Sequence, residues 1–503
     1  MGFSKLFFVN YIPGSLFFKP NSGKMETKFI DLHIHPAMKP LGKSFNNKQG
    51  RNNPDKNRVD SIWHYDAATF LDKALNITTT LTKFRQSDFT SLAKGGAEIV
   101  LVSLCGLEKG FLMTKLGTGL KGDIVGNLVT GLGKKRIDHV QKMTDYFSDL
   151  EMEYDFYTQL DGHKVKIDGI WHRYKIVSNF NEIEENQEPG IHTIFVILTI
   201  EGMHVFNAGL QMMGRTADPD EILANVDKVK NWDKRLFFIG LTHHFYNEMV
   251  GHAQSLSGVV RKMIDQTEGM DSGFNELGWK VLRKLLDNTN GRRVLPDLKH
   301  MSVKARNEYY RFLEEEHPGE IIPLIVSHGA VNGFRSPLEK VEDDLFNYGK
   351  FQPTDINFFD NEIVKIARSG GLFGIQFDER RLASEMELKK TGPALARRKM
   401  LFYKSKLVWN QIQHIAEVLN RHNLFAWGIQ CIGSDYDGMV NPLNGFWGAE
   451  EMPLFDSYLE KHAYNFLASS QSDDLKDYNK MRASDIVERF MHANARDFLK
   501  KNF

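Results

Sequence analysis

The chain has 503 residues, with 64 basic and 64 acidic side chains, so its formal net charge is zero. Its content of 42% hydrophobic and 25% charged residues is that of an ordinary globular protein and excludes the disordered and fibrous classes. The balanced charge gives no electrostatic basis for binding nucleic acid or an anionic membrane surface.

Residues 1–26 contain two short apolar runs, but Asn10 and Pro13 interrupt them, and we expect a soluble N-terminal extension and not a signal peptide. No apolar run approaches the roughly 18 residues that a membrane-spanning helix needs. The chain has two cysteines, Cys105 and Cys431, both within apolar runs. We therefore expect core thiols, a reducing compartment and a cytoplasmic location.

Eight short apolar runs, each closed by a polar or Gly-rich turn, predict β-strands. In chain order they cover residues 28–35, 97–105, 193–201, 235–243, 293–300, 321–328, 372–378 and 427–435. Helix start and stop residues predict helices between them, at 219–229, 303–316, 361–369 and 394–420, with a closing amphipathic helix at 484–500.

Strands that are apolar on both faces and alternate with helices indicate a parallel sheet covered on both sides, and eight such units predict a (β/α)8 TIM barrel. We expect one barrel over residues 27–503 with insertions at about 36–62, 106–190 and 439–480. The first reads as a long loop and the third as an irregular segment. The second reads as a Gly-rich stretch, a helical stretch at 137–160 and a hairpin at 163–177, and could form a lid or an interface.

Histidines and carboxylates stand at the ends of the predicted strands. His33 and His35 end the first strand, where their spacing places both imidazoles on one face. The other strand-end residues are Glu201, His243, His300, His328 and Asp435. Taken singly, each is more often a structural residue, a turn former or a helix cap. Because the ends of barrel strands meet at one mouth, the set as a whole predicts a metal site.

Imidazole and carboxylate are ligands that zinc favours, and a site for two divalent ions needs a bridging carboxylate. Glu201 is the natural bridge, since no lysine ends the third or fourth strand to serve instead. Lys299 is adjacent to His300 and is expected to face the other way. We expect His204, His244 and His252, which are off register, to lie behind the ligands or at the surface.

Several motifs resemble those of the membrane (renal) dipeptidases, within the amidohydrolase superfamily. They occur in that family's order over nearly the whole chain: Asp31 to His35, Gln86 to Asp88, Gly95 to Ala97, Glu201 to His204, Leu241 to His243, Gly273 to Gly278, Asp297 to Ser302, Ser327-His328, Asn357 to Asp360 and Gly433 to Gly438. The resemblance implies a barrel of the metal-dependent hydrolase type.

By that resemblance, His33, His35 and Glu201 would bind one divalent metal, and Glu201, His300 and His328 a second. Zinc is the expected metal, with manganese or iron as alternatives. His243 would stabilise the developing oxyanion of the substrate, and Asp435 would handle the proton of the attacking water.

The chain departs from the family at two places. His35 stands where the family usually has an aspartate, which removes a negative charge. The family's substrate-binding arginine corresponds to Arg335, but an insertion follows it at 336–356.

The expected activity is hydrolysis of the amide bond of a dipeptide or a similar small amide. The alternatives are another amidohydrolase, acting on a lactam, a lactone or a cyclic amide, a PHP-type phosphoesterase with three metals, and a barrel without catalytic activity, which the filled ligand positions disfavour. The sequence leaves a homodimer open.

Overall fold

The computed structural model describes residues 27–79, 82–112, 131–256, 261–262, 264–339, 349–390 and 396–503. The expected N-terminal extension, residues 1–26, and most of the Gly-rich stretch of the second insertion lie outside the described residues. Among those described, no helix combines the length and apolar character needed to cross a membrane.

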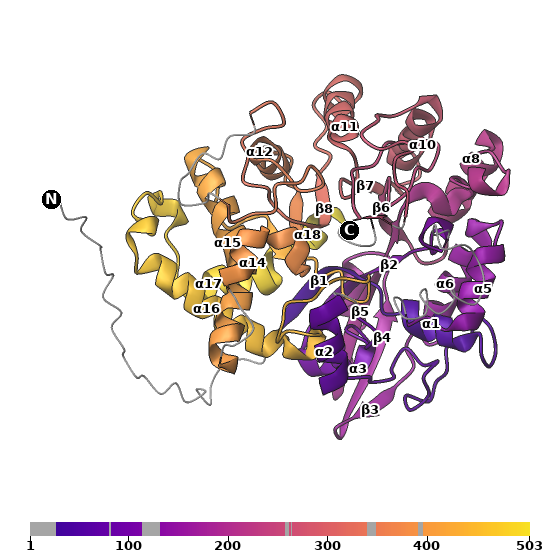
Figure 1. The fold of residues 1–503 in the computed structure, drawn as a ribbon, viewed down its shortest axis with the longest axis horizontal. Coiled ribbons are helices and arrows are strands. Elements are labelled where there is room, and N and C mark those ends of the chain that lie inside the picture. Colours follow the sequence, from indigo (N-terminus) through magenta and orange to yellow (C-terminus); the bar gives the residue numbers. More distant parts are fainter. Residues whose placement is uncertain are drawn as a thin grey trace.

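Eight parallel strands form a closed barrel at the centre of the molecule (Figure 1). Around the barrel they are β1 (Phe29–Ile34), β2 (Ala97–Leu104), β5 (Ile191–Glu201), β6 (Leu236–Gly240), β7 (Leu295–Asp297), β8 (Ile325–Gly329), β9 (Leu372–Ile375) and β10 (Gln430–Ile432). Pairing of β10 with β1 and of β2 with β5 closes the ring. The predicted (β/α)8 barrel and its eight strands are confirmed.

Helices cover the outside of the barrel (Figure 1). Their bounds are α1 (Met38–Ser44), α2 (Phe70–Thr79), α3 (Phe89–Gly95), α5 (Lys134–Lys142), α6 (Tyr146–Thr158), α7 (Asn181–Glu185), α8 (Pro219–Lys230), α10 (Glu276–Leu286), α11 (Val303–Glu316), α12 (Asp360–Arg368), α13 (Glu379–Leu382), α14 (Glu385–Lys390), α15 (Arg397–Arg421), α16 (Met452–Leu467), α17 (Ala483–Glu488) and α18 (Asn494–Asn502). The four predicted crossover helices correspond to α8, α11, α12 and α15, and the closing helix to α17 and α18 with a π-helical turn at Arg489–Ala493 between them.

The insertions are more regular than expected. The segment 439–480 holds the 16-residue helix α16, which buries Phe455, Leu459 and Phe466 on one face, so the apolar spacing there was helical. The segment 36–62 begins with α1. The stretch 137–160 is two helices, α5 and α6, because Asp145 starts a new helix by accepting the N–H of Ser148.

The predicted hairpin consists of β3 (Val165–Ile167) and β4 (Ile170–Ile176), and it joins the barrel sheet. β5 has 11 residues, and Ile191 to Val196 pair with β4 while Leu198 to Glu201 pair with β6. The carboxyl-terminal part of the second insertion is therefore anchored to the barrel, through pairing of β4 with the first half of β5.

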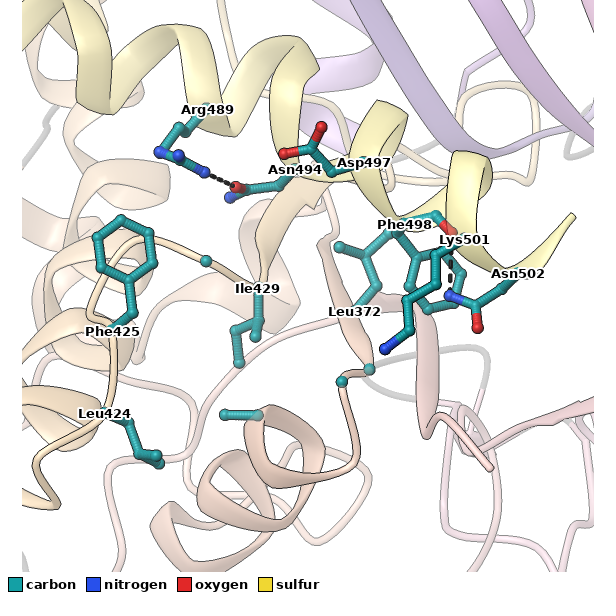
Figure 2. A pocket seen from close by; sticks show the side chains of 14 residues that line it. Leu372, Leu424, Phe425, Ile429, Arg489, Asn494, Asp497, Phe498, Lys501 and Asn502 are labelled. Carbon is teal, nitrogen blue, oxygen red and sulfur yellow. Dashed lines mark hydrogen bonds between the residues drawn. The ribbon is translucent and has the colours of Figure 1, made fainter. Parts of the chain in front are cut away.

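A surface hollow of about 410 Å³ lies at the amino ends of β9 and β10, against α18 (Figure 2). Leu372, Ile429 and Phe498 form its apolar wall, and the Arg489 guanidinium donates to Asn494 Oδ1 at 3.2 Å. This hollow is at the end of the barrel opposite to the strand-end histidines.

Candidate metal centre

The carboxyl ends of the barrel strands bring the predicted ligands together. His33, in β1, and His35, just after it, are both 1% exposed, and their Nε2 atoms lie 3.0 Å apart. The N–H of Asp435 donates to the His33 carbonyl, and Asp31 Oδ1 accepts the N–H of Ser434, so β1 also positions the loop that follows β10.

Glu201, the last residue of β5, lies at the centre of the histidines and is 5% exposed. Its Oε1 is 3.5 Å from His33 Nε2, 3.2 Å from His300 Nε2 and 3.4 Å from His328 Nε2. Its Oε2 is 3.2 Å from His35 Nε2 and 3.5 Å from His243 Nε2. Burial alone would raise the pKa of Glu201, but the charges of His243 and His33 hold it well below its usual value.

Among the groups of three donors whose ligand atoms lie within 4.8 Å of one another, two share Glu201 and consist of the predicted metal ligands alone. One consists of His33, His35 and Glu201 and the other of Glu201, His300 and His328. The usual Zn–N distance is about 2.0–2.1 Å, so two imidazole nitrogens that bind one tetrahedral zinc are about 3.3 Å apart. The observed separations are 3.0 Å for His33 and His35 and 3.3 Å for His300 and His328. The residues present fit a pair of divalent ions.

Hydrogen bonds hold two of these imidazoles in the orientation that a metal ligand needs. His35 Nδ1 is 3.0 Å from the Ser103 carbonyl, and His328 Nδ1 is 2.8 Å from Ser327 Oγ. When Nδ1 is held by a hydrogen bond, Nε2 faces the position that the metal ion would occupy. This is the usual arrangement of metal-bound histidines.

Asp435 lies beside both donor sets. Its Oδ1 is 3.5 Å from His35 Nε2 and its Oδ2 is 3.9 Å from His328 Nε2. Gln376 Nε2 donates to Oδ2 at 2.7 Å, and Lys299 Nζ donates to Gln376 Oε1 at 3.2 Å. Asp435 adopts a left-handed backbone conformation (φ 60°).

The expectation that Lys299 faces away from the site is wrong. β7 ends at Asp297, and the backbone turns at His300 (φ 66°), so strand alternation no longer applies to these two residues. Lys299 is 1% exposed, and burial together with the charge of Arg381 lowers its pKa to about 7.

His243 follows β6 and its ring lies between two carboxylates. Nε2 faces Glu201, and Nδ1 is 2.7 Å from Glu108 Oε2. Burial alone would raise the pKa of Glu108, but the charges of His243 and His204 lower it.

Arg335 is not among the residues brought together at the barrel mouth. It is exposed, lies 4.0 Å from Glu339, and lines a surface hollow with α12 and the carboxyl end of α15. Arg381 instead lies close to the site: its guanidinium donates to the Ser255 carbonyl, and the Ser255 Oγ is 2.6 Å from His244 Nδ1.

The off-register histidines are buried or half-buried. His204 Nε2 is 2.6 Å from the Gly106 carbonyl, and both nitrogens of His252 face main-chain carbonyls. His244 packs against His243 and His300, and the ring of His204 stacks on that of His243, so these two lie directly behind the predicted site.

Gln376 and Glu108 were missed by the sequence reasoning. Gln376 lies inside the predicted seventh strand, near its end, and the rule that found the histidines could have found it. Glu108 is three residues beyond the second predicted strand, where strand register gives no information.

The geometry can be set beside known proteins. No protein-family model matches the chain, and no curated protein matches it. The chain resembles solved metallopeptidases. A metallo peptidase from Rhodobacter sphaeroides, liganded with a phosphinate mimic of the dipeptide L-Ala-D-Ala, is 13% identical, with a TM-score of 0.48 over 95% of this chain and 99% of that one.

Two further structures give similar values. Dipeptidase AC, a metallo peptidase of family M19, is also 13% identical, with a TM-score of 0.48 over 95% of this chain and 99% of its own. The probable dipeptidase PvdM from Pseudomonas aeruginosa is 12% identical, with a TM-score of 0.44 over 83% of this chain and 90% of its own.

Proposed function

We propose that the protein is a hydrolase that uses two divalent metal ions to cleave the amide bond of a dipeptide or a similar small amide. The observation that carries the proposal is the position of Glu201, whose two oxygens lie within 3.5 Å of five histidine Nε2 atoms. A carboxylate that is shared in this way suits a bridge between two ions.

His33, His35 and Glu201 would hold one ion, and Glu201, His300 and His328 the other. Zinc fits this nitrogen-rich donor set, and manganese or iron are the alternatives. Divalent ions bound there supply Lewis acidity and lower the pKa of water toward neutrality.

The remaining polar residues then have separate roles. Asp435, held by Gln376, accepts the proton of the attacking water and returns it to the leaving amine as general base and then general acid. The His243 ring lies between Glu108, which faces Nδ1, and Glu201, which faces Nε2, and its Nε2 side stabilises the carbonyl oxygen as negative charge develops on it.

The substrate is a small molecule, and neither nucleic acid nor a membrane takes part. Cys105 and Cys431 are both buried free thiols, which suits a reducing, cytoplasmic compartment. A homodimer is compatible with this function but not required by it.

The test is a panel of dipeptides, lactams and simple phosphoesters, presented to the zinc-loaded and the manganese-loaded protein. Hydrolysis of one or more amides is expected. Hydrolysis of phosphoesters alone, or inactivity across the panel, would overturn the proposal. Asp435→Asn should lower kcat about 100-fold or more with the metal content unchanged, because a positioned acid–base group contributes about 10²–10⁴ in rate.

A further inference from the structure

A buried carboxylate outside the predicted site contacts the residue proposed to bind the oxyanion. Glu108 lies in the loop after β2, at the start of the second insertion, and is 3% exposed. Its Oε2 is 2.7 Å from His243 Nδ1, closer than Cys105 Sγ at 4.0 Å. We propose that Glu108 is the positioning residue that directs His243 Nε2 into the active site.

Glu108 also fixes the main chain that carries His243. Its Oε2 accepts the N–H of His244 at 3.2 Å, and its Oε1 accepts the N–H of Phe245 at 3.1 Å. Three donors from three consecutive residues therefore meet at one carboxylate. Such a group sets both the position of the loop and the rotation of the ring.

The consequence for His243 follows from the two nitrogens of imidazole. A carboxylate can only accept at this site, so Nδ1 carries one proton, which faces Glu108, and Nε2 must carry a second for the ring to stabilise an oxyanion. The ring is then held with Nε2 at 3.5 Å from Glu201 Oε2, on the side where the substrate carbonyl would lie. Carboxylates orient metal-bound and catalytic histidines in the same way.

Among the residues that the structure describes, no other neighbour of His243 Nδ1 can replace this contact. Cys105 Sγ is 4.0 Å from His243 Nδ1, which is too far and too weakly accepting to fix the ring. The rings of His204 and His300 pack against it through their faces or edges. Without Glu108, we expect the His243 ring to rotate and its Nε2 to leave the site.

The inference rests on the proposed function, and a double-mutant cycle tests it. In the metal-loaded enzyme, Glu108→Gln should lower kcat about 10- to 100-fold, with KM changed less than twofold and metal content unchanged. In the His243→Ala background the same substitution should change kcat less than twofold, because Glu108 acts through that imidazole. Equal losses in both backgrounds, or a loss of metal, would overturn the positioning role.

Glu248→Gln is the matched control. Glu248, which lies on the loop that follows β6, also accepts two main-chain N–H groups, of Gly209 at 3.0 Å and Ala217 at 3.1 Å, which belong to the segment between β5 and α8. It should leave kcat within twofold of wild type. If Glu248→Gln lowered kcat as much as Glu108→Gln, the effect of Glu108 would come from holding the main chain of a loop and not from orienting His243, which would overturn the proposal.

A measurement without activity separates this inference from the proposed function. The measurement is ¹⁵N NMR of the zinc-loaded wild type with labelled histidine. The His243 resonance is assigned by its absence from the spectrum of His243→Gln, and it should show a protonated Nδ1. An unprotonated Nδ1 would overturn the inference, whether or not any amide is cleaved and whether or not Glu108→Gln folds. Inactivity of the wild type with a protonated Nδ1 would overturn only the function.

Discussion

At the scale of single residues, the proposed metal site depends on one carboxylate shared by two donor sets. Glu201 is the only residue common to the sets His33–His35 and His300–His328. Replacing it by glutamine keeps the shape of the side chain but removes the charge and one anionic oxygen from each set.

We therefore expect Glu201→Gln to lower the bound metal from about two ions to fewer than one per chain, measured by elemental analysis after dialysis. Glu153→Gln is the control, since Glu153 is buried nearby and only accepts the N–H of Cys105, at 2.8 Å. Retention of two ions by Glu201→Gln would show that the carboxylate is not a bridge.

The residue after Glu201 can only be glycine without strain. Gly202 has φ 90° and ψ 126°, and a Cβ there would lie 2.4 Å from His204 Nδ1 and 2.9 Å from His243 Cβ. This conformation is essentially restricted to glycine and costs other residues about 1–3 kcal/mol.

Gly202→Ala should therefore lower the free energy of unfolding by about 2 kcal/mol or more, measured by urea denaturation, and should also displace His243. Gly214→Ala is the comparison: Gly214 has φ 71° and ψ 18°, and nothing lies within 4 Å of a Cβ there. It should cost only the left-handed penalty of about 1–2 kcal/mol. A smaller loss at position 202 than at 214 would contradict this account.

At the scale of elements, the turn that carries His300 is held by the helix that follows it. α11 begins three residues after His300, and its N-cap Ser302 accepts the N–H of Ala305 at 2.9 Å and donates to the Ser272 carbonyl. The cap therefore ties the start of the helix to the loop that precedes α10.

Ser302→Ala should destabilise the protein by about 1 kcal/mol, since an N-cap hydrogen bond is worth about that much. It should also weaken metal binding, because His300 lies on the freed turn. Asp218→Ala, which removes the N-cap of α8, should cost a similar free energy and leave metal affinity unchanged. Titration calorimetry measures the zinc affinity of both variants. Equal affinities would show that the N-cap of α11 does not affect metal binding by His300.

The barrel strands were predictable because each is a short apolar run with a polar end, as in Thr193 to Glu201. The histidines were predictable as a set because the ends of barrel strands meet at one mouth, although β6 ends at Gly240 and β7 at Asp297, so His243 and His300 lie in the turns beyond their strands. Lys299 was not, because its orientation depends on the backbone turn at His300. Glu108 was not, because only the folding of the second insertion brings it to His243, and α16 was not recognised as a helix.

At the scale of the whole molecule, a charge cluster joins the amino end of β2 to the carboxyl-terminal helices. Glu98 accepts hydrogen bonds from His492 Nε2 at 2.8 Å and Arg496 at 2.6 Å and lies 3.4 Å from Lys28. Burial alone would raise the pKa of Glu98, but the hydrogen bond from His492 and these charges lower it to about 2.

Because the pKa of Glu98 is lower in the folded protein than its unfolded value of 4.5, its carboxylate stabilises the fold at pH values above 4.5. This contribution is lost as the pH falls toward about 2. Glu98→Gln should therefore cost about 1–3 kcal/mol at pH 7, and its difference from wild type should shrink between pH 4.5 and the acid limit. Urea denaturation at several pH values measures this. The exposed Glu488, 3.7 Å from His492 Nδ1, is the control, and Glu488→Gln should cost less than about 0.5 kcal/mol.

The pairing of β1 with β10 imposes an order in time on the making of this protein. Asp31 pairs with Ile432, about 400 residues later, so β1 leaves the ribosome roughly 20–80 s before its partner at ordinary synthesis rates. His33 and His35 are synthesised about the same time before the loop that carries Asp435. The barrel cannot close, and the proposed metal site cannot be completed, until nearly the whole chain has been synthesised.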